Sequence, residues 1–401
     1  MSAFRAELPL LHDRHTHVSF YAALAGAADL SGCRVLGEAL EKLGEQKGPL
    51  RLGRGWRSNL YELPPAALDR LGPALVCNVS LHSFRMSAPA RELLARDFPD
   101  IAAGIDDQDW VERHLPRVFS LFTASGAGGI PGFMERLAAL GVWAAEDMLV
   151  CPEEAALLLA RSYAGRVKLW AAPDVYRRLG QEAKKAVGGI KLFADGALGA
   201  RTAALSGEYL RGGQGLLLHS RDELEGLLRE AADLTGRVAV HAIGGAALEQ
   251  LLSALERSGI PAGDLAVRIE HAQLIGPEQA RRAKKLGAVL CMQPNFSSDS
   301  ADYADRLPEE CLRANNPFRM LIDGAGFVPG EDLLFGSDGM PHGARAALEA
   351  ALFPPYPGQR LALAEFRAGY CLPDTSAGRL ALEIDEEKRT AAVEVRLASA
   401  L

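Results

Sequence analysis

The sequence predicts an α/β protein built on a (β/α)8 barrel of the TIM type, with loop insertions and a short β-structure near its C-terminal end. Two observations predict this class. Short apolar stretches alternate with amphipathic stretches of helical periodicity, as expected for parallel strands joined by helices. There are about eight such strands, which favours a closed barrel over an open sheet.

The expected strands are short apolar runs bounded by glycine, polar or charged residues. They cover residues 74–80, 141–145, 166–170, 189–193, 237–241, 266–271, 288–292 and 333–337, with a further extended segment around residues 12–17. Helical periodicity between the later strands covers residues 222–234, 246–258 and 277–286.

Two stretches do not follow this alternation. Residues 42–73 contain glycine and proline in a loop-like context, and residues 85–125 have mostly helical periodicity. We interpret both as insertions in barrel loops, where lids and specificity elements commonly lie. The barrel with its insertions is expected to span residues 10–370. Residues 371–401 would form a separate β-structure, since residues 379–397 alternate with period two about a charged turn, as in a hairpin.

Composition narrows the choice of partners. The chain has 44 Lys plus Arg against 51 Asp plus Glu, a formal net charge of −7, which argues against a nucleic-acid binder that relies on phosphate contacts. No apolar run reaches the length of a signal peptide core or a membrane span, so we expect a cytoplasmic protein without membrane contact. The six cysteines are scattered without a C-x-x-C pair, which disfavours a structural zinc ribbon.

Histidines and a carboxylate follow the expected strands in a pattern typical of a metal site. His15 and His17 are separated by one residue, so on an extended segment both imidazoles point to the same face. His241 and His271 each end an apolar strand, and Asp338 ends another. Because the carboxyl ends of barrel strands meet at one mouth, these side chains are expected to converge there.

Lys191 lies within a very apolar strand, in the segment Gly188-Gly-Ile-Lys191-Leu-Phe-Ala-Asp195. A buried ammonium is costly unless it is paired, neutralised or chemically modified. An internal salt bridge to Asp195 or Asp338 is the simplest expectation.

The order of these residues resembles the amidohydrolase superfamily: His-x-His near the first strand, Lys on the fourth, His on the fifth and sixth, and Asp on the eighth. The sequences of these motifs resemble most those of its N-substituted formamide deformylase-like (amidohydrolase 3) branch. The resemblance runs from about residue 12 to residue 345 and includes Val240-His-Ala-Ile-Gly244, Ile269-Glu-His-Ala-Gln273, Ser337-Asp-Gly-Met-Pro341 and Leu140 to Met148, which resembles the third-strand region.

The resemblance implies a barrel with one or two divalent metal ions, usually zinc. The implied metal ligands are His15, His17, Lys191, His241, His271 and Asp338. Lys191 matches a position that is carboxylated by CO2 in many relatives, and the resulting carbamate bridges two metals.

The implied mechanism uses a metal-activated water, because a bound Zn²⁺ lowers the pKa of its water to about 7. Asp338 would take the proton and pass it to the leaving amine, and His241 or His271 would stabilise the oxyanion. The expected contacts with the small-molecule substrate are His82, which resembles a second-strand histidine of the branch, together with Asp195, Arg201 and His342.

One feature departs from the family pattern. Relatives usually carry some 50 residues before the His-x-His strand, which form half of a β-sandwich completed by the C-terminal tail. Only 14 residues precede His15, so the N-terminal half is expected to be missing. Exposed strand edges on the remaining tail would favour association into a homodimer.

Three functional readings follow. The leading one is a metal-dependent hydrolase that cleaves a C–N bond of an amide, formamide or cyclic amide. The second is an aminohydrolase that deaminates a heterocycle; Glu270, the candidate acid, is expected to point away from the site by strand alternation, which counts against it. The third is a degenerate barrel that binds a ligand without turnover. Hydrolysis of a phosphotriester or lactone by the same site is also open, and the sequence does not predict the substrate.

Overall fold

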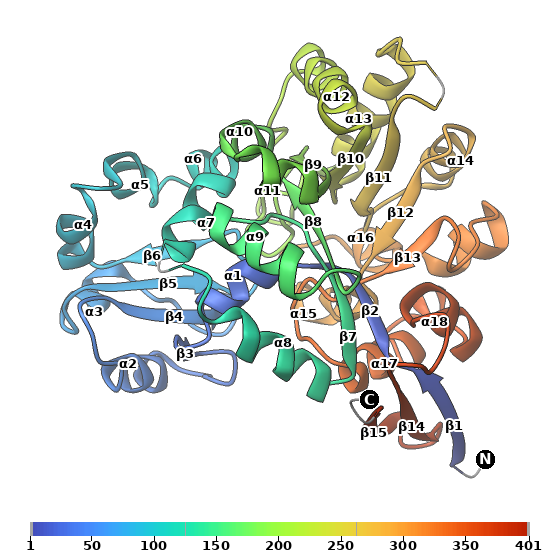
Figure 1. The fold of residues 1–401 in the computed structure, drawn as a ribbon, viewed down its shortest axis with the longest axis horizontal. Helices are drawn as coiled ribbons and strands as arrows, with labels where there is room; N and C mark the ends of the chain where they lie inside the picture. Colours follow the sequence, from blue (N-terminus) through green and yellow to red (C-terminus); the bar gives the residue numbers. More distant parts are fainter. Residues whose placement is uncertain (1–2, 125, 262, 399–401) are drawn as a thin grey trace.

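Eight parallel strands form the centre of the molecule. The structure is a computed structural model, and it describes residues 3–124, 126–261 and 263–398. Neighbouring strands follow the order β13-β12-β11-β10-β9-β8-β7-β2, and helices surround them (Figure 1). The strands are β2 (Leu11–Thr16), β7 (Val142–Asp147), β8 (Val167–Ala171), β9 (Val187–Phe193), β10 (Arg237–Ala242), β11 (Ala266–His271), β12 (Val289–Met292) and β13 (Leu333–Phe335). The predicted (β/α)8 barrel is confirmed.

The first and last strands are joined by residues at their carboxyl ends. The backbone N–H of Asp338 donates to the carbonyl of His15 at 2.6 Å. The backbone N–H of Ser337 donates to Asp13 Oδ1 at 2.8 Å, and the Ser337 hydroxyl also donates to the Asp13 carboxylate. This seam brings two segments from opposite ends of the chain to the same place.

The barrel helices follow the strands in the expected alternation. They are α8 (Ile130–Ala139), α9 (Glu153–Ser162), α10 (Pro173–Arg178), α11 (Gln181–Ala186), α12 (Arg221–Thr235), α13 (Gly245–Arg257), α14 (Pro277–Lys285), α17 (Ala344–Leu352) and α18 (Leu363–Tyr370). Helix α12 has strong boundary signals: Ser220 and Glu223 form a capping box at its start, and Gly236 ends it with a φ of 65°. Among the described residues, none of the helices has the length and apolar character needed to cross a membrane.

A four-stranded sheet is inserted after the first barrel strand (Figure 1). Its strands are β3 (Ala28–Asp29), β4 (Arg51–Trp56), β5 (Ala74–Asn78) and β6 (Phe84–Met86), with α2 (Leu36–Gly44) and α3 (Pro65–Asp69) between them. Leu43, Trp56, Leu68 and Val76 belong to a separate apolar cluster in this insertion. The expectation that residues 74–80 form a barrel strand is therefore wrong, since β5 pairs with β4 and β6.

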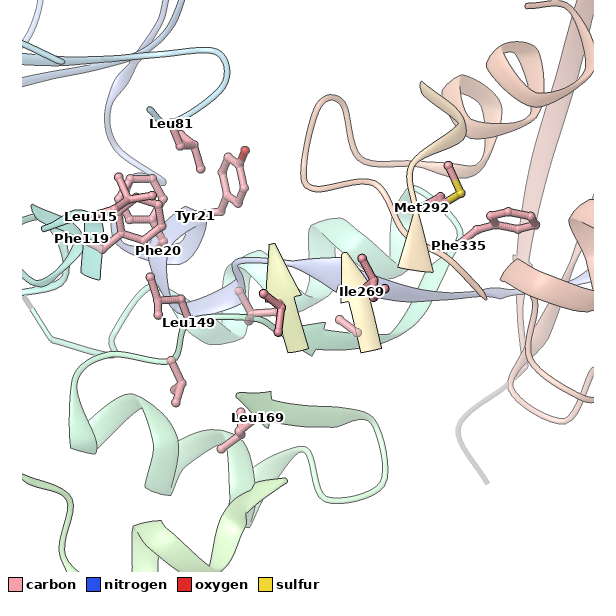
Figure 2. Packing of buried hydrophobic residues seen from close by; sticks show 14 of the residues in the cluster. Phe20, Tyr21, Leu81, Leu115, Phe119, Leu149, Leu169, Ile269, Met292 and Phe335 are labelled. Atoms are coloured by element: carbon pink, nitrogen blue, oxygen red, sulfur yellow. The ribbon is translucent and has the colours of Figure 1, made fainter. Parts of the chain in front are cut away.

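Short helices connect the inserted sheet to the barrel. They are α1 (Val18–Ala23), α4 (Ala88–Leu94), α5 (Pro99–Gly104), α6 (Gln108–Arg113) and α7 (Leu115–Thr123). The prediction that residues 85–125 are mostly helical is confirmed from Ala88 to Thr123, whereas residues 85 and 86 belong to strand β6 and residue 125 lies outside the described residues. Phe20 of α1 and Phe119 of α7 stack with ring centroids 4.1 Å apart, close to Leu115 and Tyr21 (Figure 2). This packing holds the inserted segment against the first barrel strand.

After β12 the chain forms several irregular short helices before it returns to β13. They are η1 (Pro294–Ser298), α15 (Asp299–Asp302), α16 (Glu309–Ala314) and the π-helix η2 (Met320–Gly324). A buried amide network holds this segment together. Asn315 Nδ2 donates to the carbonyl of Phe296 at 2.8 Å, and Asn316 Nδ2 donates to the carbonyl of Gln293 at 2.8 Å.

The C-terminal residues form the predicted hairpin, which is confirmed as β14 (Gly378–Asp385) and β15 (Thr390–Leu397). The residues before the barrel supply a third antiparallel strand, β1 (Phe4–Pro9), on the other side of β14. Alternate residues Leu380, Leu382 and Ile384 are buried in the main core, so this sheet packs on the barrel. Of the expected C-terminal range, residues 399–401 lie outside the described residues.

Candidate active site

Three of the expected metal ligands meet at the carboxyl ends of the barrel strands. One nitrogen each of His15 and His271 and an oxygen of Asp338 all lie within 4.8 Å of one another. His15 and His271 are almost fully buried, and the Asp338 side chain is 13% exposed. Two imidazoles and a carboxylate at this spacing are a donor set that first-row divalent metals accept.

His17 lies beside this group, where β2 gives way to helix α1. Its Nε2 is 3.2 Å from Asp338 Oδ1, and its Nδ1 is buried with no hydrogen-bond partner among the residues that the structure describes. The ring centroids of His15 and His17 are 5.7 Å apart. The His-x-His spacing thus places both rings near the same carboxylate.

His241, at the end of β10, lies on the other side of His271, with ring centroids 4.4 Å apart. Its Nε2 is 3.0 Å from the carbonyl of Gly196. The neighbouring Asp195 accepts hydrogen bonds from the backbone N–H groups of Ile243, Gly244 and Ala204 at 2.8–3.0 Å. Burial raises the pKa of Asp195 to about 7, and its contacts organise the backbone around His241.

Lys191 points into the barrel from β9 and is 1% exposed. Its Nζ has no hydrogen-bond partner among the described residues, so the expected salt bridge to Asp195 or Asp338 is not formed. Burial lowers the pKa of Lys191 to about 8, with Glu270 and Asp338 opposing the shift. A buried amine of lowered pKa has an appreciable neutral fraction at neutral pH, which is the form that reacts with CO2.

Two of the ligand positions have unusual backbone geometry. His271 has a φ of 69° and Asp338 a φ of 53°, the left-handed region that non-glycine residues seldom adopt. The turn at His271 interrupts strand alternation, so both His271 and Glu270 are directed into the barrel. Gln293 Oε1 accepts from His271 Nδ1 at 2.7 Å, which leaves the opposite ring nitrogen for the site.

The expectation that Glu270 points away from the site is wrong. Its Oε2 is 2.5 Å from His15 Nδ1, and its other oxygen accepts from Arg268. Arg268 in turn donates to Glu146 Oε2 at 2.8 Å, and its guanidinium lies 4.7 Å from the Trp170 ring. A buried ionic layer of these residues therefore supports His15, one of the expected metal ligands, from inside the barrel.

His82 lies at the same mouth. The resemblance implies that it belongs to the second barrel strand, but it follows β5 of the inserted sheet. Its Nδ1 is 2.7 Å from Glu112 Oε2, and Thr202 donates to the other oxygen of Glu112 at 2.6 Å. Although burial opposes the charged form, Glu112 raises the pKa of His82 above its usual value. The His82 ring is 5.2 Å from that of His241.

The other two expected substrate contacts lie elsewhere. His342 Nε2 is 2.7 Å from the Thr16 hydroxyl, and its ring packs against Tyr21 and Phe133. Arg201 is partly exposed on the loop after β9, with a φ of 59°. Neither residue lines the cavity that contacts His241, His271 and Asp338.

The protonation of the site suits metal binding. Burial lowers the pKa of His15 and of His271 well below the usual value, which keeps both imidazoles neutral. Burial alone would raise the pKa of Asp338, but His15 and His17 lower it below its usual range. Lys191 Nζ and His17 Nδ1, without hydrogen-bond partners in the described part of the chain, are among the buried polar atoms that a bound metal centre would satisfy.

The barrel and the side chains that converge at its mouth define a protein of the amidohydrolase barrel class. Residues 127–344 match the model of the amidohydrolase family, and the chain belongs to that family.

The chain is 27% identical over 360 residues to YtcJ of Bacillus subtilis (strain 168), a protein named as an amidohydrolase. This match covers 77% of the chain and 66% of YtcJ, just under two thirds of that protein's length. Two solved structures are also similar, both described as uncharacterized metal-dependent hydrolases. One is from Pyrococcus horikoshii OT3, with a TM-score of 0.67, 26% identity, and coverage of 87% of this chain and 74% of that one. The other is from Pyrococcus furiosus, with a TM-score of 0.65, 25% identity, and coverage of 90% and 80%.

Several residues of the site were missed by sequence reasoning, namely Glu112, Glu146, Arg268, Gln293 and Trp170. Arg268 and Glu270 carried a signal, because two opposite charges two residues apart within an apolar strand point to the same side and are costly to bury unpaired. Glu112 carried none, since it lies on a short amphipathic helix whose docking against the barrel the sequence does not reveal.

Proposed function

We propose that this protein is a metal-dependent hydrolase that cleaves a C–N bond of a small molecule, an amide, formamide or cyclic amide. The observation that carries the proposal is the convergence of His15, His271 and Asp338, with ligand atoms within 4.8 Å, beside a buried Lys191 amine that has no hydrogen-bond partner in the described part of the chain. The sequence resemblance to the N-substituted formamide deformylase-like branch supports the choice of a C–N bond.

The residues that would hold the metal are His15, His17, His241, His271 and Asp338, with zinc as the proposed ion. A bound divalent ion supplies a water of lowered pKa and polarises the carbonyl of the substrate. Addition of CO2 to the neutral Lys191 amine, with loss of a proton, would give a carbamate anion and allow a second metal to bind. This modification also removes the cost of a buried cation.

The chain's own groups supply the proton transfers. Asp338 Oδ1 faces His17 Nε2 at 3.2 Å and is kept ionised, so it is suited to accept a proton from the attacking water. The same carboxyl then donates that proton to the leaving nitrogen. His82, held by Glu112, lines the same cavity as Asp338 and would donate a hydrogen bond to the substrate there.

Metal content by elemental analysis tests the proposal first. We expect about two metal ions per chain in protein purified without chelator, falling to one or none in Lys191→Ala. A screen of N-formyl and N-acyl amines on the metal-loaded protein should then reveal amine release. A well-folded protein that holds no metal after incubation with Zn²⁺ or Mn²⁺ and bicarbonate would contradict the hydrolase and favour a ligand-binding barrel.

The same screen separates amide hydrolysis from deamination of a heterocycle. Ammonia released from an aminated heterocycle, with no turnover of amides, would support the deaminase. Both oxygens of Glu270 are engaged, one by His15 and one by Arg268, so this residue is not available as the acid of such a reaction.

A further inference from the structure

The cavity at the metal ligands is too small for a substrate. It contacts His82, His241, His271 and Asp338 and has a volume of about 20 Å³, roughly the space of one water. Sites for small molecules commonly occupy about 300–1,000 Å³. The part of the substrate remote from the bond that is cleaved therefore needs other space.

A larger cavity of about 400 Å³ adjoins the metal centre on the β9 side. We name it the Phe193 groove; its apolar walls include Pro173, Phe193, Leu218 and Leu227. The Phe193 ring forms the wall between the two spaces, since its centroid lies 5.3 Å from that of His241 and 5.1 Å from Lys191 Nζ. Movement of this one ring would join the groove to the metal centre.

Glu112 is, after Phe193, a second residue that connects the groove with the cavity at the metal ligands. It lines the groove, while its carboxylate holds His82, which lines the cavity at the metal ligands. Once the Phe193 ring moves aside, one end of a molecule in the groove would approach His82 and the metal ligands.

Among the described residues, the charged side chains along the groove leave a positive charge without a paired carboxylate. The carboxylate of Glu112 is engaged by His82 and Thr202, and Asp174 pairs with Arg178 at 2.9 Å. Arg113 is exposed and donates to the carbonyl of Leu218 at 2.6 Å. Within the described part of the chain, no carboxylate lies at ion-pair distance from the Arg113 guanidinium. A guanidinium in this state is suited to bind a carboxylate or another planar anion.

We propose that the Phe193 groove binds the body of the substrate, and that this body is an apolar group ending in an anion that pairs with Arg113. This inference rests on the proposed function for the position of the amide. It adds the substrate class, an amide whose apolar substituent carries a carboxylate remote from the bond that is cleaved.

A matched pair of substrates tests the groove. The probes are N-formyl-phenethylamine and 4-(2-formamidoethyl)benzoate, which differ only in the carboxylate. We expect the metal-loaded protein to have the lower KM for the carboxylate. Arg113→Gln should raise the KM for this substrate about fivefold to tenfold, so that most of the difference in KM between the two substrates is lost. The matched control is Arg211→Gln, an exposed arginine outside the groove, which should change neither KM.

A binding measurement separates this inference from the proposed function. Calorimetry with 4-ethylbenzoate and 4-ethylbenzamide does not require hydrolysis. Tighter binding of the benzoate, lost in Arg113→Gln, supports the groove even if no amide is cleaved, in which case the proposed function alone fails. Turnover of both formamides with equal KM, together with an Arg113→Gln variant that behaves as wild type, would overturn the groove and leave the hydrolase standing.

A second variant tests the dividing wall. Phe193→Leu keeps an apolar side chain and should lower the KM for formamides with substituents bulkier than phenyl by opening the passage to the metal centre. Far-ultraviolet circular dichroism confirms folding. Unchanged selectivity for bulky substituents in a folded variant would contradict the placement of the substrate behind Phe193.

Discussion

His15 Nδ1 and Glu270 Oε2 lie 2.5 Å apart in the barrel interior, although 255 residues separate them in the chain. Both side chains are almost completely buried. A carboxylate at this nitrogen holds the ring so that its Nε2 faces Asp338, 3.7 Å from Oδ1. Contacts of this kind fix the tautomer and the direction of a metal-binding histidine.

Substitution of Glu270 should therefore weaken metal binding. We expect Glu270→Gln to lower metal affinity by about 10-fold to 100-fold, the usual effect of losing such a supporting carboxylate. Competition with a chelator of known affinity measures the metal affinity of each variant. The matched control is Glu278→Gln on the exposed face of α14, which should leave the affinity unchanged. Equal affinities in wild type and Glu270→Gln would show that the contact does not position His15.

Loss of Glu112 should disturb His82 without removing the metal. A hydrogen bond to a charged group contributes about 1.5–3 kcal/mol, so Glu112→Gln should lower kcat/KM by roughly tenfold or more at full metal occupancy. Nitrogen NMR of the His82 ring should show a changed tautomer or proton occupancy. Asp109→Asn, an exposed substitution on the same helix, is the control. A merely structural role would lower stability and leave the His82 spectrum intact.

Arg268 is the centre of the buried ionic layer. Its removal leaves the carboxylates of Glu146 and Glu270 buried without their main cation, so Arg268→Met should destabilise the fold by about 3–5 kcal/mol. Arg268→Lys should retain little of this stability, because an ammonium cannot bridge both carboxylates while lying against Trp170. Urea unfolding of the metal-free protein measures both variants. Full stability in Arg268→Lys would contradict the need for a guanidinium.

The pair of helices α13 and α14 should show acid-dependent stability. Arg282 forms hydrogen bonds with Glu249 and Glu256 at 2.7–2.9 Å and holds the pKa of both carboxyl groups below the usual 4.5. A lowered folded-state pKa contributes stability above pH 4.5, which is lost as the pH falls through the folded-state values.

The network is largely exposed, so its contribution is small. Arg282→Gln should lower the free energy of unfolding by up to about 1 kcal/mol at pH 7 and by progressively less towards pH 3. Chemical denaturation across this pH range is the measurement. Arg281→Gln serves as control, since its partner Glu278 lies on the same helix. A loss that stays constant with pH would rule out the ionic explanation.

The strand ends of the barrel were predictable because each carries a local signal. His241 follows an apolar strand, and barrel geometry alone then places its side chain at the mouth. The inserted sheet was not predictable in the same way. Strand β3 has only two residues, and β4 contains Gly53 and Gly55, which are typical of loops. A Cβ at Gly53 would lie 2.9 Å from Leu43 Cδ2, so a larger residue there would require the Leu43 side chain to shift.

Glu270 shows a second limit of sequence reasoning. Alternation places neighbouring residues of a strand on opposite faces, and by this rule Glu270 and His271 cannot both face the site. The φ of 69° at His271 ends the regular strand and removes the conflict. A single backbone angle thus changed the inferred role of a buried carboxylate, and nothing local in the sequence predicts that angle.

The seam between β2 and β13 also constrains how the protein is made. Asp13 and Ser337, which close it, are 324 residues apart, and contacts of such high sequence separation require the costly closure of a very long loop. A ribosome must therefore deliver nearly the whole chain before the first strand meets the last. Until then the proposed ligands His15 and Asp338 cannot share an ion, so on the proposed function a nascent or truncated chain would have no complete metal centre. On this proposal, metal loading would report that folding has finished.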